Sequence, residues 1–263
     1  MIKVVELFVN NTKPKALELS ERIKEELLKE GYILSCGSLI PDLVIGFGGD
    51  GTLLKWLSEN DYATRAKYIG INCGTLGFLQ DFEVDDVHNF VLNIPNYYPE
   101  NLNFISLEII SCDGSFLFNS LNEFSVISNV NKSFRCRVDI SDEFLEDFVG
   151  TGLIFSSPTG STAHSLSSVG CIVYPGIEAI QMTPSEAIVN RELRCLPKSI
   201  CIPKDIITCL YPSNDDEVQI ISDGIKVFEG NYVKMSISYS NSHMTKLTNC
   251  KNSFVKKVRE KLI

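Results

Sequence analysis

The sequence predicts a two-domain protein: a Rossmann-like α/β domain followed by an all-β sandwich domain. Two observations support this fold class. Over residues 1–95, short apolar runs alternate with helix-type segments, which is typical of a parallel, doubly wound sheet. Over residues 96–245, strand-like runs follow one another with only turn residues between them, which is typical of a β-sandwich. The last segment, residues 246–263, has apolar residues at helical spacing, and we expect it to return to the first domain.

The first domain is expected to alternate strands and helices along the chain. The longest helix candidate has apolar residues at Leu19, Ile23, Leu27 and Leu28, which fits one buried face, and Gly31 is expected to close it. The expected elements are a strand over 2–9, a helix over 16–29, a strand over 43–47, a helix over 53–58, a strand over 68–71 and a helix over 84–92.

The second domain is expected to be built from short strands. An acidic cluster over 142–147 interrupts them, and its charge predicts a solvated loop or helix face. The expected strands lie at 104–110, 115–119, 122–128, 134–140, 152–157, 171–173, 198–202, 206–211, 217–221, 225–228 and 232–239.

Composition narrows the class of protein. The 263 residues carry a formal net charge of −9, which argues against nucleic acid as the main partner. No apolar stretch approaches the roughly 20 residues of a membrane span, and the N-terminus is typical of a strand and not of a signal peptide, so we expect a cytoplasmic protein. The nine cysteines never form a C-x-x-C pair, which favours reduced thiols over disulfides or a zinc site.

The strongest functional signal is the sequence GGDGT at 48–52, which follows the apolar run 43–47 and precedes a helix. Bare backbone N–H groups and a helix N-terminus both favour phosphate at such a turn. Asp50 places a negative charge in this anion site, so we expect it to accept a hydroxyl proton, to hold a metal, or both. The alternative is that Asp50 only caps the helix. A second glycine loop, 72–79, follows the next strand and should line the same crevice.

Three polar groups stand out in the second domain. Residues 156–167 are rich in Ser and Thr, whose hydroxyls can bind a sugar or phosphate; the alternative is an ordinary turn with a helix cap. The pair Asn122-Glu123 opens a strand, and taken alone it favours a solvated strand end. The sequence Ser222-Asp223-Gly224 predicts a hairpin turn.

Together these motifs resemble the NAD kinase family of the bacterial type. They are GGDGT at 48–52, NxGxLGFL at 72–79, NE at 122–123 and PTGSTAxSLS at 158–167. The resemblance implies phosphoryl transfer from ATP, another triphosphate or polyphosphate to the 2′-hydroxyl of the adenosine ribose of NAD, giving NADP. It also implies a Rossmann-like domain with a β-sandwich domain and assembly as homodimers or homotetramers. A divalent cation, usually Mg²⁺, is expected to neutralise the donor, because few cations lie near the motifs in sequence.

The resemblance also implies roles for single residues. Asp50 matches the catalytic residue and is expected to act as the general base. No residue is assigned as a metal ligand. The positions that match dinucleotide-binding residues are Gly48, Gly49, Gly51, Thr52, Phe78, Asn122, Glu123, Thr151, Thr162, Ala163, His164, Ser165, Leu166 and Ser167.

Three positions depart from the family pattern. Thr151 stands where the family has an acid near the nicotinamide, His164 replaces an aromatic residue that stacks on adenine, and Ile225 replaces a glutamine. These changes affect substrate binding and leave Asp50 in place. Two alternative functions follow from the same motifs: a lipid kinase of the diacylglycerol type, which shares GGDGT, and a non-catalytic NAD(P)-binding sensor.

Overall fold

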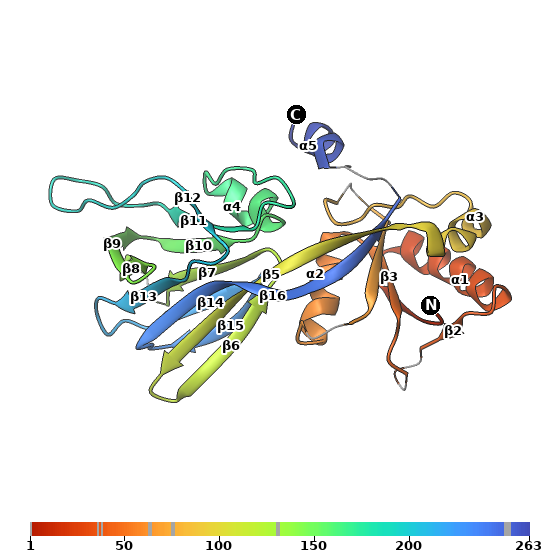
Figure 1. Cartoon of the computed structure of the whole chain (residues 1–263), viewed down its shortest axis with the longest axis horizontal. Coiled ribbons are helices and arrows are strands. Elements are labelled where there is room, and N and C mark those ends of the chain that lie inside the picture. The colour runs from red at the N-terminus through yellow and green to blue at the C-terminus, as the bar shows by residue number, and fades with distance from the viewer. Residues whose placement is uncertain are drawn as a thin grey trace. The chain divides into compact units, whose positions relative to one another are not determined.

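The chain folds into two compact units. The computed structural model describes residues 2–35, 37, 39–62, 65–74, 77–129, 132–249 and 254–263. One unit comprises residues 1–102 together with 243–263, and the other comprises residues 103–242 (Figure 1). The chain leaves the first unit within strand β5 (Tyr98–Ser111) and re-enters it within strand β16 (Lys234–Thr248). The C-terminal segment therefore belongs to the first unit, as the helical spacing predicts.

The first unit has the expected alternation of strands and helices. Strands β2, β1, β3 and β4 are parallel neighbours, and the end of β16 adds beside β4 through Lys246 and Tyr68. Its elements are β1 (Val4–Val9), α1 (Pro14–Lys29), β2 (Ile33–Leu34), β3 (Leu43–Gly48), α2 (Asp50–Glu59), β4 (Lys67–Asn72), α3 (Val87–Leu92), the short 3-10 helix η1 (Ile94–Asn96) and α5 (Phe254–Leu262).

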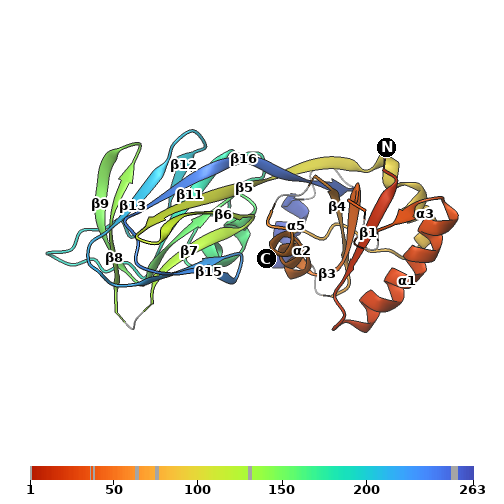
Figure 2. The same cartoon turned by 90° about the horizontal axis from the view of Figure 1, so that it is seen from below.

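Helices cover both faces of this parallel sheet, which is why its central strand is apolar throughout. Helices α1 and α3 lie on one side of the strands and α2 on the other (Figure 2). Alternate residues of β3, among them Ile45 and Phe47, join the core cluster beneath α1 and α3. On the other face Trp56 of α2 packs against Tyr68 of β4, with ring centroids 6.4 Å apart. Gly46 leaves room there for the Tyr68 hydroxyl, which would lie 1.9 Å from a β-carbon at that position.

The second unit is a β-sandwich. One sheet has the order β12-β11-β10-β7-β14-β15, and it faces strands that belong to the larger sheet, including β8, β9 and β13. Besides parts of β5 and β16, its elements are β6 (Gly114–Ser120), β7 (Glu123–Ser128), β8 (Phe134–Ile140), β9 (Glu143–Gly150), β10 (Gly152–Ser156), the 3-10 helix η2 (Gly160–Thr162), α4 (His164–Ser167), β11 (Ala179–Ser185), β12 (Ile200–Pro203), β13 (Thr208–Pro212), β14 (Val218–Ser222) and β15 (Ile225–Gly230).

Alternation along β11 separates the core from the polar face of its sheet. Ile180 and Met182 belong to the core cluster of the sandwich. Gln181 and Thr183 point to the opposite face, where both are buried and hydrogen-bonded to Ser165 of α4. The Ser/Thr-rich segment is therefore held on the outer face of this sheet.

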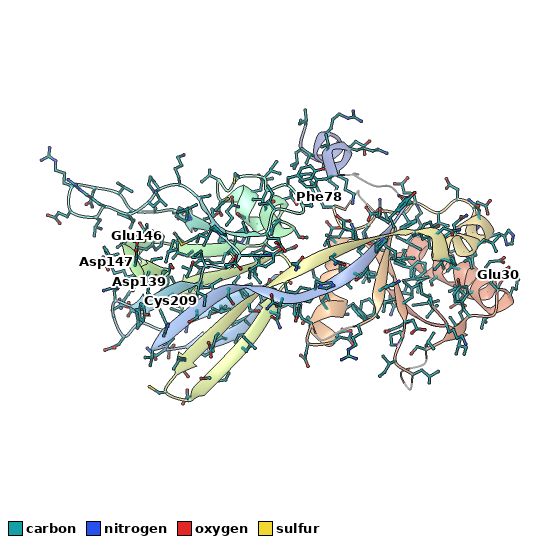
Figure 3. The ribbon with its side chains drawn as sticks, viewed as in Figure 1. Glu30, Phe78, Asp139, Glu146, Asp147 and Cys209 are labelled. Carbon is teal, nitrogen blue, oxygen red and sulfur yellow. The ribbon has the colours of Figure 1, made fainter. Side chains whose placement is uncertain are left out.

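The acidic cluster corrects one expectation. Residues 143–150 form strand β9 and not a loop or helix, because they pair with β8, where Val138 lies opposite Glu146. The expected exposure holds for Asp142, Glu143 and Asp147 but not for Glu146. Glu146 is buried and accepts a hydrogen bond from the Leu196 N–H, and burial raises the pKa of its carboxyl group. Asp147 next to it is exposed (Figure 3). Two further expectations fail nearby: residues 171–173 are not a strand, and strand β11 was not expected.

Among the residues that the structure describes, no helix combines the length and the apolar character that crossing a membrane requires.

Candidate active site

The two glycine loops of the first unit meet at the carboxylate of Asp50. Asp50 is the first residue of α2, and only Gly49 separates it from the end of β3. Its Oδ2 accepts the backbone N–H of Phe78 at 2.7 Å, and its Oδ1 accepts the N–H of Leu79 at 2.9 Å. Both loops follow the carboxyl ends of parallel strands, where ligands bind in open α/β sheets. The two loops are therefore adjacent, as a shared crevice requires, for the described part of the second loop; Thr75 and Leu76 lie outside the described residues.

The carboxylate of Asp50 does not cap its helix, so that alternative is wrong. Gly49 is the N-cap residue, and its N–H donates to the hydroxyl of Thr52 at 3.2 Å. The side chain of Thr52 is buried and is used in this contact. Position 48 must be glycine for the Thr52 side chain to fit, because a β-carbon at Gly48 would lie 1.9 Å from the Thr52 hydroxyl oxygen.

The outer face of the first loop is open. Within the described chain, a β-carbon on Gly49 or on Gly51 would have no heavy atom within 4 Å, its own neighbours aside. The space outside Gly49 and Gly51 leaves room for a ligand at the start of α2, where the helix dipole favours an anion. The carboxylate of Asp50 thus lies beside a space that suits an anion such as a phosphate group.

Lysines surround these loops in the fold, although few lie near the motifs in sequence. Lys261 of α5 places its ammonium 4.1 Å from the centre of the Phe78 ring, and Lys257 donates to the carbonyl oxygen of Phe78. Figure 3 labels Phe78 beside this helix. Burial lowers the pKa of both ammonium groups. Lys13, before α1, lies so close to Gly74 that a β-carbon there would be 2.2 Å from its Nζ. The expected shortage of cations is thus wrong, because α5 returns to this unit.

A buried ion-pair network anchors α5 and the second loop. Lys246 of β16 contacts Asp81 at 2.7 Å and Glu100 at 2.9 Å, and Lys257 also pairs with Asp81. The side chains of Lys246 and Asp81 are 3% and 2% exposed. Burial alone would lower the pKa of Lys246, but the ion pairs with Asp81 and Glu100 outweigh it and the pKa is raised. This network fixes the residues that follow Phe78 and Leu79.

In the second unit, the pair Asn122-Glu123 is buried, so a solvated strand end is wrong. The two residues are 8% and 7% exposed. The carboxylate of Asp223 accepts their backbone N–H groups at 2.7 and 3.2 Å, the N–H of Leu121 at 2.8 Å and the hydroxyl of Ser120 at 2.5 Å. One side chain thereby holds the whole turn that precedes β7.

Asp223 lies in the predicted hairpin turn between β14 and β15. Its φ of 48° and the φ of 83° at Gly224 both fall in the left-handed region, as in the tight turns that join twisted strands. Sequence reasoning predicted the turn and missed the role of the carboxylate. The only signal in the sequence is the Asp-Gly pair, which the turn alone explains.

Glu123 has the most perturbed carboxyl group of this site. Burial, and to a smaller degree the charge of Asp223, raise its pKa to about 7, although the backbone N–H of His164 donates to it. Its Oε2 is buried and has no hydrogen-bond partner among the described residues. A buried acceptor without a donor is costly, so this oxygen suits a ligand that brings a hydroxyl or N–H group.

The Ser/Thr-rich segment uses part of its hydroxyls to hold itself together. The buried hydroxyl of Ser157 donates to the Leu121 carbonyl at 2.5 Å, and that of Ser161 donates to the Pro158 carbonyl at 2.7 Å. Ser165 is buried against Thr183 and Gln181. The other predicted site residues of this segment are partly or fully exposed: Thr162, Ala163, His164, Leu166 and Ser167. These are free to face a ligand.

Two of the departures from the family pattern have defined contacts. The hydroxyl of Thr151 donates to a carboxylate oxygen of Glu186 at 2.7 Å, so an acidic group stands beside position 151. The Nδ1 atom of His164 lies 3.2 Å from the hydroxyl of Ser125, which fixes the direction of the exposed ring.

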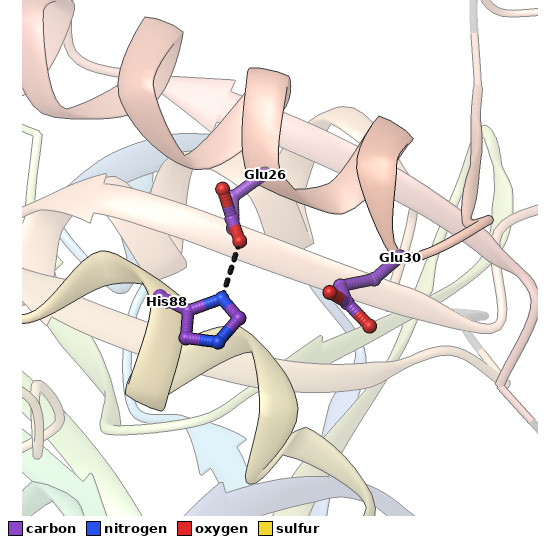
Figure 4. Close-up of side chains that lie close together, drawn as sticks. All are labelled: Glu26, Glu30 and His88. Carbon is purple, nitrogen blue, oxygen red and sulfur yellow. Dashed lines mark hydrogen bonds and ion pairs between the residues drawn. The ribbon is translucent and has the colours of Figure 1, made fainter.

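Two further features of the first unit lie apart from the glycine loops. His88 is exposed and pairs with Glu26 at 2.5 Å beside Glu30 (Figure 4). The hydrogen bond to Glu26 raises the pKa of His88 and lowers that of Glu26. The two side chains therefore form a surface ion pair that needs no ligand. A groove of about 950 Å³ is lined by residues that include Lys3, Asp42 and Lys67. Lys3 and Asp42 directly precede β1 and β3, and Lys67 is the first residue of β4, so all three lie at the opposite ends of the strands from Asp50.

Comparison with known proteins identifies the class of this protein as a kinase that acts on NAD. The family described as ATP-NAD kinase C-terminal domain matches residues 121–246. The NAD kinase of Lactobacillus gasseri is 35% identical over 198 residues, covering 74% of this chain and 73% of that protein. The NAD kinase of Finegoldia magna is 28% identical over an alignment of 270 residues, covering 99% and 98%.

Two solved structures share the fold over nearly the whole chain. A crystal structure of yeast NADH kinase complexed with NADH has a TM-score of 0.86 at 21% identity and covers 99% of this chain and 87% of that one. An NAD kinase from Archaeoglobus fulgidus in complex with ATP has a TM-score of 0.76 at 20% identity and covers 98% and 99%. On the identity with the bacterial enzymes, this chain belongs to the NAD kinase family.

Proposed function

We propose that this chain transfers the terminal phosphoryl group of ATP to the 2′-hydroxyl of the adenosine ribose of NAD, giving NADP, with Asp50 as the general base. Another triphosphate or polyphosphate can replace ATP as the donor. The observation that supports this most is the carboxylate of Asp50, held by the N–H groups of Phe78 and Leu79 at the edge of an open phosphate site. Membership of the NAD kinase family weighs against the lipid kinase and the sensor.

The proton transfer is assigned to Asp50. A ribose hydroxyl is a weak nucleophile, and a carboxylate within hydrogen-bond reach can remove its proton as phosphorus is approached. Each carboxylate oxygen of Asp50 accepts one backbone N–H and retains a further lone pair for the hydroxyl. The two N–H groups also stop the carboxylate from rotating away.

The phosphates of the donor are assigned to the start of α2 and to nearby cations. Gly48, Gly49, Gly51 and Thr52 form the turn, and Lys261 supplies a positive charge close to Phe78. A divalent cation, Mg²⁺ by preference, neutralises charge on the phosphates when bound. The residues present fit such a cation: Asp50 offers a carboxylate, and Mg²⁺ commonly needs only one or two besides phosphate oxygens.

The second unit is assigned to binding NAD. Glu123 offers a buried acceptor without a donor, and Asn122 is held beside it by Asp223. The exposed ring of His164 can stack on adenine, and Thr162, Ala163, Leu166 and Ser167 are accessible in the same segment. Ser165 is buried and supports this segment from beneath. Glu186, bonded to Thr151, supplies the acidic group that the family places at position 151. From the family resemblance we also propose a homodimer or homotetramer, which mass measurement in solution would test.

The test is NADP formation by the purified chain from NAD and ATP, with and without Mg²⁺. We expect Asp50→Asn to lower turnover by about 10² or more, the usual cost of losing a general base, while calorimetry still detects NAD binding. Asp113→Asn, in the exposed turn between β5 and β6, is the matched control and should leave turnover unchanged.

Three results would contradict the proposal. Near-normal turnover in Asp50→Asn would remove the base role. NAD binding without NADP formation from any triphosphate or polyphosphate would favour the sensor. Transfer of radiolabel from ATP to diacylglycerol but not to NAD would favour the lipid kinase.

A further inference from the structure

Two exposed cysteines of the second unit lie side by side. Among the cysteines that the structure describes, Cys112, Cys171 and Cys201 are exposed. The Sγ atoms of Cys171 and Cys201 are 3.8 Å apart. Cys171 follows α4, and Cys201 lies on β12, the edge strand of its sheet. The catalytic roles proposed above use neither thiol.

A buried glutamine holds this pair in place. Gln181 of β11 lies directly opposite Cys201 of β12 in the strand register, so both side chains point to the same face of the sheet. The backbone N–H and the thiol of Cys171 donate to Oε1 of Gln181 at 2.8 and 2.7 Å. Gln181 is 1% exposed. The closeness of the two sulfur atoms is thus built into the sheet.

We propose that Cys171 and Cys201 are a modification site, at which a small-molecule disulfide converts the two thiols into a reversible intrachain disulfide. The Cys171 thiolate attacks one sulfur of the oxidant, forming a mixed disulfide and releasing one thiolate, which takes up the proton that Cys171 lost. The Cys201 thiolate then attacks the Cys171 sulfur and releases the second thiol. Two protein thiols are oxidised and one small disulfide is reduced to two thiols.

The geometry requires only a local approach of the two sulfurs. They must move from 3.8 Å to about 2.0 Å, the length of a disulfide bond. Cys201 sits on an edge strand and Cys171 in the irregular segment after α4, so the segment bearing Cys171 can supply this movement.

The order of attack follows from the surroundings of Cys201. Burial raises its pKa to about 11, and the hydrogen bond and charge of Cys171 add to this effect. The raised pKa lowers the thiolate fraction of Cys201, so we assign the first attack to Cys171. Once Cys171 is a mixed disulfide, its hydrogen bond and its charge no longer raise the pKa of Cys201. The pKa of Cys201 then falls, which favours the second attack.

The cross-link would change the hydrogen bonds that support the segment assigned to NAD binding. Gln181 also donates from its amide nitrogen to the hydroxyl of Ser165 at 2.8 Å. Oxidation removes the thiol hydrogen bond from Cys171 to Gln181 and so changes the support of Ser165. We expect the KM for NAD to rise about two- to fivefold, at roughly constant kcat; this consequence rests on the proposed function.

Peptide mapping tests the cross-link without any assay of activity. The full chain is treated with oxidised glutathione, digested without reductant and analysed by mass spectrometry. We expect a linked peptide containing Cys171 and Cys201, which dithiothreitol removes. Cys171→Ser and Cys201→Ser should each abolish it, whereas Cys112→Ser should retain it. Because Cys36 and Cys250 lie outside the described residues, the experiment is repeated in a Cys36→Ser/Cys250→Ser background.

Two results would overturn the inference. Separate glutathione adducts on Cys171 and Cys201, with no linked peptide in folded protein, would show that the thiols do not join. Links from either residue to other cysteines would show a different partner. An unchanged KM for NAD in the cross-linked, active enzyme would overturn the coupling through Gln181. A preparation without any kinase activity would bear only on the proposed function.

Discussion

Gly77 lies against the carboxylate of Asp50. A β-carbon built on Gly77 would lie 2.1 Å from Oδ1 and 2.9 Å from Cγ of Asp50. Because no carbon can approach an oxygen so closely, the bare backbone at position 77 is what allows the next two residues to donate their N–H groups to Asp50. The position of the Asp50 carboxylate thus depends on a glycine in a different loop.

Gly77→Ala should therefore lower kcat by about 10- to 100-fold, since a displacement of the order of 1 Å at a reacting group can have this effect. Steady-state kinetics with NAD and ATP measure it. Gly51→Ala is the matched variant, because its β-carbon would have nothing within 4 Å in the described protein. Its melting temperature should not fall, and any rise in KM reports a clash with the ligand. Unchanged kcat in Gly77→Ala would show that the loop yields without moving Asp50.

Asp223→Asn should weaken NAD binding and leave the carboxylate of Asp50 unchanged. The substitution removes the charge that accepts three backbone N–H groups and one hydroxyl around Asn122 and Glu123. Hydrogen bonds to a charged group contribute about 1.5–3 kcal/mol each, so a loss of about 2–4 kcal/mol of stability is expected. Urea unfolding measures this loss, and calorimetry measures the NAD affinity. Asp215→Asn, in a surface loop, is the control and should change neither the stability nor the NAD affinity. Wild-type stability and affinity in Asp223→Asn would show that the Asp223 carboxylate does not hold Asn122 and Glu123 in place.

Glu123 should make stability and NAD binding depend on pH. Its pKa is raised from 4.5 in the reference state to about 7 in the fold, so the fold favours the neutral acid. The folded chain therefore loses stability as pH rises from about 4.5 to about 7, by up to about 3 kcal/mol. Glu123→Gln should remove this loss, so its free energy of unfolding should exceed that of the wild type at pH 8 but not at pH 4.

The ionised form of Glu123 is the better acceptor for a hydroxyl group of NAD. The KM for NAD should accordingly fall as pH rises through about 7 in the wild type, and Glu123→Gln should abolish that dependence. Initial rates at pH 5.5 to 8.5, with unfolding curves at the same values, measure both effects. A pH-independent difference in stability between the two proteins would exclude the raised pKa.

Asp81→Asn should destabilise the first unit and release α5. The substitution leaves the buried ammonium of Lys246 and that of Lys257 without their common carboxylate. Breaking a buried ion pair from one side costs about 3–5 kcal/mol. The exposed pair of Lys132 with Asp216 provides the control, since Asp216→Asn should cost less than about 1 kcal/mol. Denaturant unfolding compares the two, and equal stability in both variants would contradict the network.

Local sequence accounts for the elements that bear the motifs. The apolar run that becomes β3, the glycines after it and the start of α2 follow from residues adjacent in the chain. The hairpin turn at Asp223 likewise follows from an Asp-Gly pair. Strand β9 did not follow, because its charges resemble a solvated surface; pairing with β8 and the Leu196 N–H are what allow Glu146 to be buried. Those partners lie elsewhere in the chain.

The sequence by itself determined the fold class, the motif that places a carboxylate among glycines, and the family, because each depends on residue types at short fixed spacings. Only the tertiary structure decided which residues position the site and which bring positive charge to it. Gly77 packs against the carboxylate of Asp50, Asp223 accepts the N–H of Asn122, and Lys261 of α5 lies over the ring of Phe78. These pairs are separated by tens to hundreds of residues. Their contacts form when strands and helices pack, so no local pattern records them.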